Sequence, residues 1–440
     1  MVWQQVLWFF SLVLCLVGGE QQSEKLISVF LLARHGERYP CHHLHHPDYP
    51  GKFLSNTCQL TVGGAKQHVE LGQFIRERYS SLFTSTNFNQ KDVHIRSTGT
   101  ERTLLSAAYF GLGFKLNASN ELPLLSAVFS TPKRYDSLLK MSSPCPAFKR
   151  LMRQSLNSNL AKDFANGERQ LFEDLKEFTD TEFDFNALHH HLPEAWKLCE
   201  PIFVWSHLES AGGGSRPPFS SALVAACHRV LSFKQQLRFV SPDQTYLRGG
   251  PLWLHLVRTL RFQLAGEEAS PPDPEIDGSD ILDIPLSKTS RIIAYFAHDS
   301  TLAAFLSHLG MFNKILPPFA SAIIVELHKL QNDELALRFF YRNDTASSLL
   351  TPLTTKFCEG QEAVWCRLSS LEARLKETVA ENVEAACSSE SPTFPLATLV
   401  AVSALAISTI FAFRLPRGVT VCLLVGLLSV LAVYRYSSQL

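Results

Sequence analysis

Residues 26–38 read Leu-Ile-Ser-Val-Phe-Leu-Leu-Ala-Arg-His-Gly-Glu-Arg, and this stretch decides the fold class. Its first eight residues are almost continuously apolar and rich in branched and aromatic side chains. Such a run is typical of a β-strand that is buried on both faces, as in parallel sheets covered by helices. Charged residues follow at once, beginning with Arg34 and His35, so titratable groups stand at the carboxyl end of this predicted strand.

Four further segments have the same strand character, namely residues 92–96, 291–298, 321–328 and 336–341. Helical patterns lie between the strands, at residues 60–79, 100–110 and 300–309. Strand, short turn and helix in alternation indicate an α/β fold. The sequence therefore predicts an α/β domain, built from residues 20–130 and 251–387, with a mostly parallel sheet flanked by helices.

The segment between these two halves, residues 131–250, is polar and helix-prone and has a glycine-rich break at residues 212–214. We interpret it as a helical cap inserted into the α/β domain. A linker at residues 388–395 follows the end of the α/β domain. The whole chain of 440 residues has 41 basic and 41 acidic residues. Because a nucleic-acid-binding protein would show a basic excess, the composition argues against a nucleic-acid partner.

Three of the predicted strands end in charged or titratable residues: Arg34, His35 and Arg38 after the first, Arg96 at the end of the second, and His298 and Asp299 after the third. The carboxyl ends of parallel strands meet at one edge of a sheet, where α/β proteins bind their ligands. Three arginines in one pocket would repel one another without an anion between them, and arginine binds phosphate through two parallel hydrogen bonds. The cluster therefore predicts a phosphate site.

Such a site is suited to phosphoryl transfer. The arginines and one histidine would neutralise the phosphate oxygens, the other histidine would attack phosphorus, and Asp299 would protonate the leaving group. The arginines supply the charge that Mg²⁺ supplies in kinases, so no metal or other cofactor is expected. An isolated Arg-His pair usually lies on the protein surface, and an isolated His-Asp-Ser sequence usually caps a helix. The prediction rests on three such sites at three strand ends.

Residues 34–40, Arg-His-Gly-Glu-Arg-Tyr-Pro, fit an RHGxRxP motif. With residues 67–72, 95–98, 101–103, 297–299, 316–320 and 341–343, they make the chain resemble the histidine acid phosphatases of prostatic and lysosomal type, over about residues 26–387. The resemblance implies His35 as the phosphorylated nucleophile and Asp299 as the proton donor. It implies a phosphate pocket of Arg34, Arg38, Arg96 and His298. It also implies metal-independent hydrolysis of phosphate monoesters in acid, and a homodimer. The motif leaves open whether Glu37 supports the site or is an exposed neighbour.

Eight of the ten cysteines lie in the body of the chain, and this even number indicates disulfides formed in a secretory compartment. The resemblance implies two retained pairs, Cys145 with Cys387 and Cys358 with Cys366. The remaining four cysteines are expected to pair as Cys41 with Cys58 and Cys199 with Cys227. Two glycosylation sequons, at Asn117 and Asn343, are usable in the same compartment.

Both ends of the chain are apolar. Residues 1–19 have the layout of a cleaved signal peptide, with an uncleaved anchor as the alternative. Residues 396–440 hold two apolar runs split by Arg-Leu-Pro-Arg, which predicts a membrane anchor of one or two spans. A lipid-anchor signal removed after residue 388 or 389 is another alternative. The catalytic domain is therefore expected in the lumen of a lysosome or other endomembrane, or outside the cell.

These features predict an acid phosphatase that acts on small-molecule or protein phosphomonoesters. One alternative is a phytase-like or phospholipid phosphatase with the same chemistry and a narrower substrate. Another is a surface glycoprotein that uses a retired phosphatase scaffold for binding, against which the intact set of site residues argues. Residues 41–46, Cys-His-His-Leu-His-His, should rim the site, and we interpret them first as a solvated loop. The alternative is that their histidines tune substrate preference or pH response.

Overall fold

The computed structural model describes residues 24–44, 57–83, 90–116, 127–208, 219–264, 286–343, 349–358, 365–379 and 382–388. The predicted signal peptide, the predicted membrane anchor and the sequon at Asn117 lie outside these residues. Within the described ranges, no helix is both long enough and apolar enough to cross a membrane.

A mixed sheet forms the centre of the structure, with the strand order β3-β2-β4-β1-β5-β6-β7 and with β8 paired to β6. The strands are β1 (Lys25–Arg34), β2 (Val93–Thr98), β3 (Val128–Thr131), β4 (Ile292–Ala297), β5 (Ala322–Lys329), β6 (Leu335–Arg342), β7 (Thr351–Leu353) and β8 (Cys366–Arg367). The five predicted strands correspond to β1, β2, β4, β5 and β6. The other three are too short to leave a recognisable pattern in the sequence.

Half of the sheet is antiparallel, so the prediction of a mostly parallel sheet is wrong. β3, β2, β4 and β1 are parallel, whereas β5 to β8 pair antiparallel with their neighbours. Only residues 330–334 connect β5 with β6, and parallel strands need a much longer connection. β5 opposes β1 because its first residue, Ala322, pairs with Ala33 near the carboxyl end of β1.

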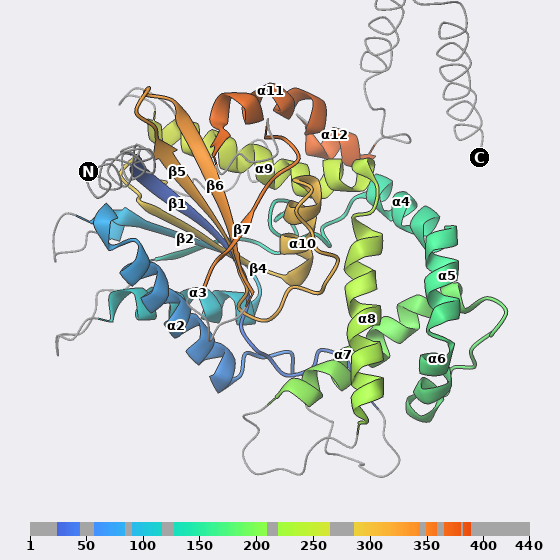
Figure 1. Cartoon of the computed structure of the whole chain (residues 1–440). Coiled ribbons are helices and arrows are strands. Elements are labelled where there is room, and N and C mark those ends of the chain that lie inside the picture. The colour runs from blue at the N-terminus through green and yellow to red at the C-terminus, as the bar shows by residue number, and fades with distance from the viewer. Residues whose placement is uncertain are drawn as a thin grey trace, which may run out of the picture. The chain divides into compact units, whose positions relative to one another are not determined.

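The helices lie on both faces of the sheet and beside it (Figure 1). They are α2 (Val62–Arg78), α3 (Glu101–Lys115), α4 (Pro146–Leu156), α5 (Asn159–Gly167), α6 (Arg169–Leu175), α7 (Leu192–His207), α8 (Ser221–Arg238), α9 (Pro242–Leu264), α10 (Asp299–His308), α11 (Leu368–Thr378) and α12 (Val383–Ser388). Short 3-10 helices lie at Ser80–Leu82, Gln90–Asp92, Lys176–Phe178 and Leu188–His191. In Figure 1, α2 and α3 cover one face of the sheet, and α9, α10 and α11 cover the other.

The helices α4 to α8, all within the segment interpreted as an insertion, form a helical part beside the sheet (Figure 1). This part has its own buried apolar cluster, which includes Phe172, Leu198 and Val230. α9 begins within the predicted insertion but belongs to the sheet, because its Leu252 and Trp253 are buried in the cluster on that face. The predicted boundary between residues 250 and 251 therefore falls inside one helix.

Three of the predicted disulfides are present, and they are Cys41–Cys58, Cys145–Cys387 and Cys358–Cys366. The predicted bond between Cys199 and Cys227 is not, because both residues are free thiols. They are fully buried on α7 and α8 within the core of the helical part, where a thiol packs as a small apolar side chain. The sequon residue Asn343 is exposed just after β6.

Candidate active site

Arg34 and His35 are held at the edge of the sheet by the pairing of β1 with β4. The last paired residues are Arg34 and Ala297, and the N–H of His35 donates to the carbonyl of Ala297 (3.0 Å). His298 therefore follows β4 where His35 follows β1. The centres of the two imidazole rings lie 5.6 Å apart. The sheet thus brings together two histidines that are distant in sequence, as predicted from the strand ends.

Gly36 allows α2 to start against the motif. A Cβ at this position would lie 2.3 Å from the carbonyl oxygen of Gly64 in the first turn of α2, so no larger residue fits without a shift of backbone. Glu37, whose place the motif left open, is buried, and its Oε1 accepts a hydrogen bond from Thr61 Oγ1 (2.7 Å). Because Thr61 is the N-cap of α2, Glu37 links the motif to the start of that helix.

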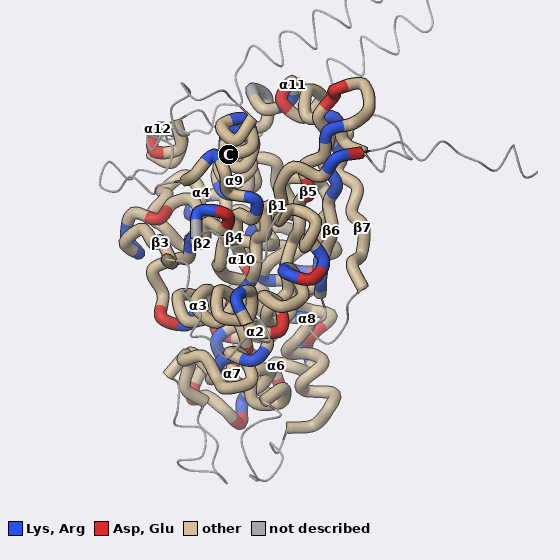
Figure 2. The backbone as a smooth tube through the Cα atoms, turned by 90° about the vertical axis from the view of Figure 1, so that its left-hand side faces the viewer, with Lys and Arg blue, Asp and Glu red and all other residues tan. Residues whose placement is uncertain are grey.

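Three guanidinium groups surround the two histidines, from Arg34 at the end of β1, Arg38 in the motif and Arg102 in the first turn of α3. Arg102 Nη2 lies 3.3 Å from His298 Nδ1. In all three arginines the Nε atom is buried and has no hydrogen-bond partner within the part of the chain that the structure describes. A buried donor without a partner is costly, so an anion that accepts from these groups would stabilise the cluster. Figure 2 shows basic and acidic positions interspersed along the backbone.

The structure does not bring Arg96 into this cluster, contrary to the prediction. β2 continues to Thr98, so Arg96 stays two residues short of the sheet edge. Its Nη2 lies 3.1 Å from Thr131 Oγ1 and 3.5 Å from Asp136 Oδ1, and all three residues are buried. The signal for Arg102 was present in the sequence, since this residue opens a predicted helix directly after the strand and so lies at the same edge.

Hydrogen bonds indicate which nitrogen of each histidine carries the proton. A guanidinium group only donates, so Nδ1 of His298 accepts from Arg102 and its Nε2–H donates to Thr98 Oγ1 (3.1 Å). Nδ1 of His35 lies 2.9 Å from the carbonyl oxygen of Gly36 and donates to it, which leaves a lone pair on Nε2 of the neutral ring. Burial, and then the charge of Arg102, hold the pKa of His35 well below its usual range and lower the pKa of His298 to about 3. Both rings are therefore neutral in mildly acidic solution before an anion binds.

Asp299 is the first residue of α10, and its Oδ2 lies 3.5 Å from Arg34 Nη2. Its side chain retains 27% of its exposure, so a ligand can reach the carboxylate. Burial raises the pKa of Asp299, but the positive charges of Arg34 and Lys234 outweigh burial and lower this pKa to about 2. A bound phosphate dianion would offset those charges and raise the pKa again.

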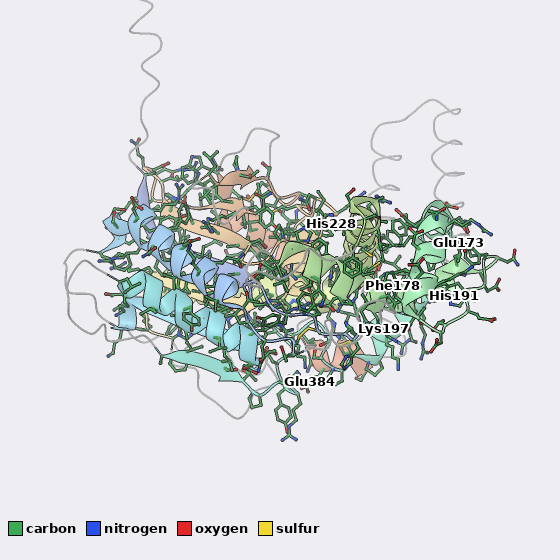
Figure 3. All side chains as sticks on the ribbon, turned by 90° about the horizontal axis from the view of Figure 1, so that it is seen from below. Glu173, Phe178, His191, Lys197, His228 and Glu384 are labelled. Atoms are coloured by element: carbon green, nitrogen blue, oxygen red, sulfur yellow. A yellow bond between two sulfur atoms is a disulfide. The ribbon has the colours of Figure 1, made fainter. Side chains whose placement is uncertain are left out.

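A cavity of about 730 Å³ opens onto Arg34, between the helical part and the loop before β5. Its walls are largely apolar and include the rings of Phe203, Phe219 and Phe319, together with His228, which Figure 3 labels on α8. The guanidinium carbon of Arg34 lies 4.1 Å from the centre of the Phe319 ring. Aromatic rings therefore lie beside an anion that is held at Arg34.

The family model of the histidine phosphatase superfamily (branch 2) matches residues 25–342, which include β1 with its motif and the segment of His298. The chain belongs to this family. It is 29% identical over 399 residues to a putative acid phosphatase 5 of Caenorhabditis elegans, covering 89% of this chain and 86% of that protein. It is 27% identical over 368 residues to the lysosomal acid phosphatase of Rattus norvegicus, covering 81% of this chain and 79% of that protein.

Among solved structures, the phytase from Citrobacter braakii is similar, with a TM-score of 0.62 and 16% sequence identity. The match covers 82% of this chain and 99% of the phytase chain. At this level of identity the likeness shows the fold alone. The chain therefore shares with this phytase its α/β fold, a mixed sheet flanked by helices.

In this histidine phosphatase, Glu200 of α7 ties the helical part to the motif loop. The carboxylate pairs with Arg38 Nη1, accepts from the N–H groups of Cys41 (3.0 Å) and His42 (3.2 Å), and lies 3.2 Å from His42 Nδ1. Burial raises the pKa of Glu200, but the hydrogen bond to His42 and the charge of Arg38 outweigh burial and lower it to about 2. His42, which belongs to the predicted histidine loop, thus has a defined partner in Glu200. Residues 45 and 46 of this loop lie outside the described residues.

We expect Glu200→Gln to destabilise the protein, because Arg38 would lose a buried partner, which costs about 3–5 kcal/mol. The lowered pKa means that this stability is fully present above the unfolded-state pKa of about 4.3 and is lost as the pH falls toward about 2. Thermal unfolding followed from about pH 6 to about pH 2 should therefore show a Tm difference from the wild type that closes in acid. A Tm difference that stayed the same at every pH would contradict a contribution from the ion pair. Glu194→Gln, which removes a surface pair with Lys197 on the same helix, should change Tm little at any pH.

Proposed function

We propose that this protein is an acid phosphatase that hydrolyses phosphate monoesters through a covalent phosphohistidine on His35. The observation that carries the proposal is the unprotonated Nε2 of His35. Nδ1 of this ring donates to the carbonyl of Gly36, so Nε2 keeps its lone pair. Around the ring lie three arginines whose Nε donors have no hydrogen-bond partner among the described residues. Membership of the histidine phosphatase superfamily and the acid phosphatases among its relatives support the same activity.

In the first step, the phosphate of the substrate binds to Arg34, Arg38 and Arg102, which neutralise its non-bridging oxygens. Nε2 of His35 attacks phosphorus opposite the ester oxygen, and a nitrogen–phosphorus bond forms while the ester bond breaks. Asp299, protonated in the complex, gives its proton to the departing oxygen. The alcohol leaves, and the phosphoryl group stays on His35.

In the second step, water attacks the phosphohistidine. The carboxylate of Asp299 takes a proton from the water as the new oxygen–phosphorus bond forms and the bond to His35 breaks. The products are inorganic phosphate, His35 in its starting state and a protonated Asp299. The positive charge comes from arginine side chains throughout, so the proposed reaction needs no metal ion.

The same scheme explains an acidic pH optimum. Asp299 must be protonated before it can act as an acid, and its pKa in the free site is about 2. A phosphate dianion beside the carboxylate raises this pKa by offsetting Arg34 and by direct repulsion. The fraction of complexes with a protonated Asp299 then increases as the pH falls, which favours turnover in acid.

Asp299→Asn is expected to slow the release of poor leaving groups by about 10²–10⁴-fold, and that of good leaving groups much less. The reason is that the anion of an acidic phenol is a good leaving group without a proton. An alkyl alcohol leaves readily only when its oxygen is protonated as the ester bond breaks. The measurement is kcat/KM, which excludes hydrolysis of the phosphohistidine, for a series of aryl and alkyl phosphates that differ in the pKa of the alcohol released. Equal slowing across the series would rule out a proton donor at this position. Asp174→Asn, on the surface of α6, is the matched control and should leave the series unchanged.

We further propose that residues 1–19 are a cleaved signal peptide and that residues 396–440 anchor the catalytic domain in a membrane, with the domain in a lumen or outside the cell. The disulfides and the exposed sequon at Asn343 support an oxidising, glycosylating compartment. The lysosomal acid phosphatase among the relatives supports a lysosomal or related location. A homodimer remains a proposal that rests on the resemblance to prostatic-type members of the family.

A further inference from the structure

A second cavity, of about 700 Å³, is bordered by α4, α8 and α9 and by residues 141–146. We call it the basic cavity, because four of the described residues that line it are basic and none is acidic. The basic residues are Lys149, Lys234, Arg238 and Arg248. The proposed reaction uses none of them.

Contacts from two sides link the walls of the basic cavity to the helix that begins with the proposed proton donor. Thr301 Oγ1, in the first turn of α10, donates to the carbonyl oxygen of Leu139 (2.6 Å), which fixes the chain leading into residues 141–146 beside Asp299. From the other wall, Lys234 and Arg238 on α8 both interact electrostatically with Asp299. An ester oxygen that takes a proton from Asp299 must lie against this carboxyl group, so the basic cavity is on the side of the leaving group.

Among the described residues, no acidic side chain forms an ion pair with the cations of this cavity. Arg248 is committed to Ser143, donating to its Oγ (2.8 Å) and to its carbonyl oxygen (2.7 Å), and so holds the wall in place. Arg238 makes one long hydrogen bond, to the carbonyl of Met141 (3.4 Å). Lys234 has no hydrogen bond or ion pair within the described residues, and its Nζ lies 5.5 Å from the centre of the Trp196 ring.

We propose that the basic cavity binds a second anionic group, a phosphate or a carboxylate, carried by the leaving group of the substrate. The inference rests on the proposed function, since it takes the leaving-group side from the role of Asp299. The substrate class is then a phosphomonoester with a further anionic group, such as a bisphosphate or a phosphorylated carboxylic acid. Lys234 and Arg238 can donate charge-assisted hydrogen bonds to such a group. Neither residue forms an ion pair within the described residues, so no existing pair has to be broken first.

The test uses two matched series of ligands that the enzyme does not hydrolyse, alkylphosphonates and alkylenediphosphonates of equal chain length, with about two to six methylene groups to cover the possible spans. Their Kd values are measured by titration calorimetry on the whole protein. At the length that spans both sites, the second phosphonate should tighten binding about tenfold or more, as a charge-assisted hydrogen bond does. Lys234→Met should remove this gain. Lys197→Gln, on α7 outside the cavity and labelled in Figure 3, should keep it.

Equal Kd values for the two series at every length would overturn the inference, as would a gain that survives both Lys234→Met and Lys149→Gln. Lys149 is exposed, so its substitution tests the cavity without disturbing the core. Thermal melting identifies a variant that fails to fold. If the wild type binds neither series, the proposed phosphate site fails and the inference fails with it. If the wild type binds both series equally, only the second site fails.

Discussion

His35→Ala is expected to abolish phosphate ester hydrolysis, with kcat at least about 10⁴-fold lower, as is found when a nucleophile is removed. The ring is the one nucleophile that the protein supplies in the proposed scheme, and the three arginines alone cannot form the covalent intermediate. The fold should persist, because Arg34 and Gly36 keep their backbone contacts with β4 and α3. The measurement is hydrolysis of an aryl phosphate from acidic to neutral pH in the presence of a chelator, with thermal melting as the check on folding.

Trapping the intermediate makes this test independent of rate. Wild-type protein quenched in alkali during turnover of a radiolabelled substrate should retain label that acid releases, as a nitrogen–phosphorus bond requires. The alanine variant should retain none. His190→Ala, in an exposed position of the helical part, is the control and should behave as the wild type. Turnover or labelling that persisted in the His35 variant would place the nucleophile elsewhere.

The sequence predicted β1 well because both of its faces are covered. Phe30 and Leu32 are buried in the cluster beneath α9 and α10, whereas Leu31 and Ala33 are buried in the cluster beneath α2 and α3. Such alternation between two apolar environments leaves an unbroken apolar run. The direction of β5 could not be predicted in the same way. Its residues are as apolar as those of β1, and its antiparallel direction is set by where the chain re-enters the sheet.

The histidines of the site were predictable because the register of β1 with β4 brings their strand ends together. The third arginine was wrongly predicted as Arg96, because a strand end cannot be located to within two residues from sequence. Arg102, in the predicted helix that follows the strand, was the better choice. The same limit applies to Cys199 and Cys227. Their separation in sequence carries no information on pairing, and only the packing of α7 against α8 determines that both are buried as thiols.

Substitution of Arg102 and of Arg96 should therefore have opposite consequences. Arg102→Ala is expected to lower kcat/KM by at least about 10²-fold and to weaken the binding of inorganic phosphate, because a donor to the phosphate is lost. It should also move the pH profile. Burial and then the charge of Arg102 lower the pKa of His298 to about 3, so this pKa should rise in the variant, as a titration of the ring by NMR would show.

Arg96→Met should instead lower stability and leave phosphate binding intact at temperatures below its Tm. Asp136 would remain buried without its arginine, and breaking a buried pair costs about 3–5 kcal/mol. Phosphate Kd, kcat/KM and Tm measured side by side on both variants decide between the two arginines. If the Arg96 variant lost phosphate affinity while the Arg102 variant kept it, the strand-end assignment made from the sequence would be the right one. The hydrogen bond between Arg102 and His298 would then be only structural.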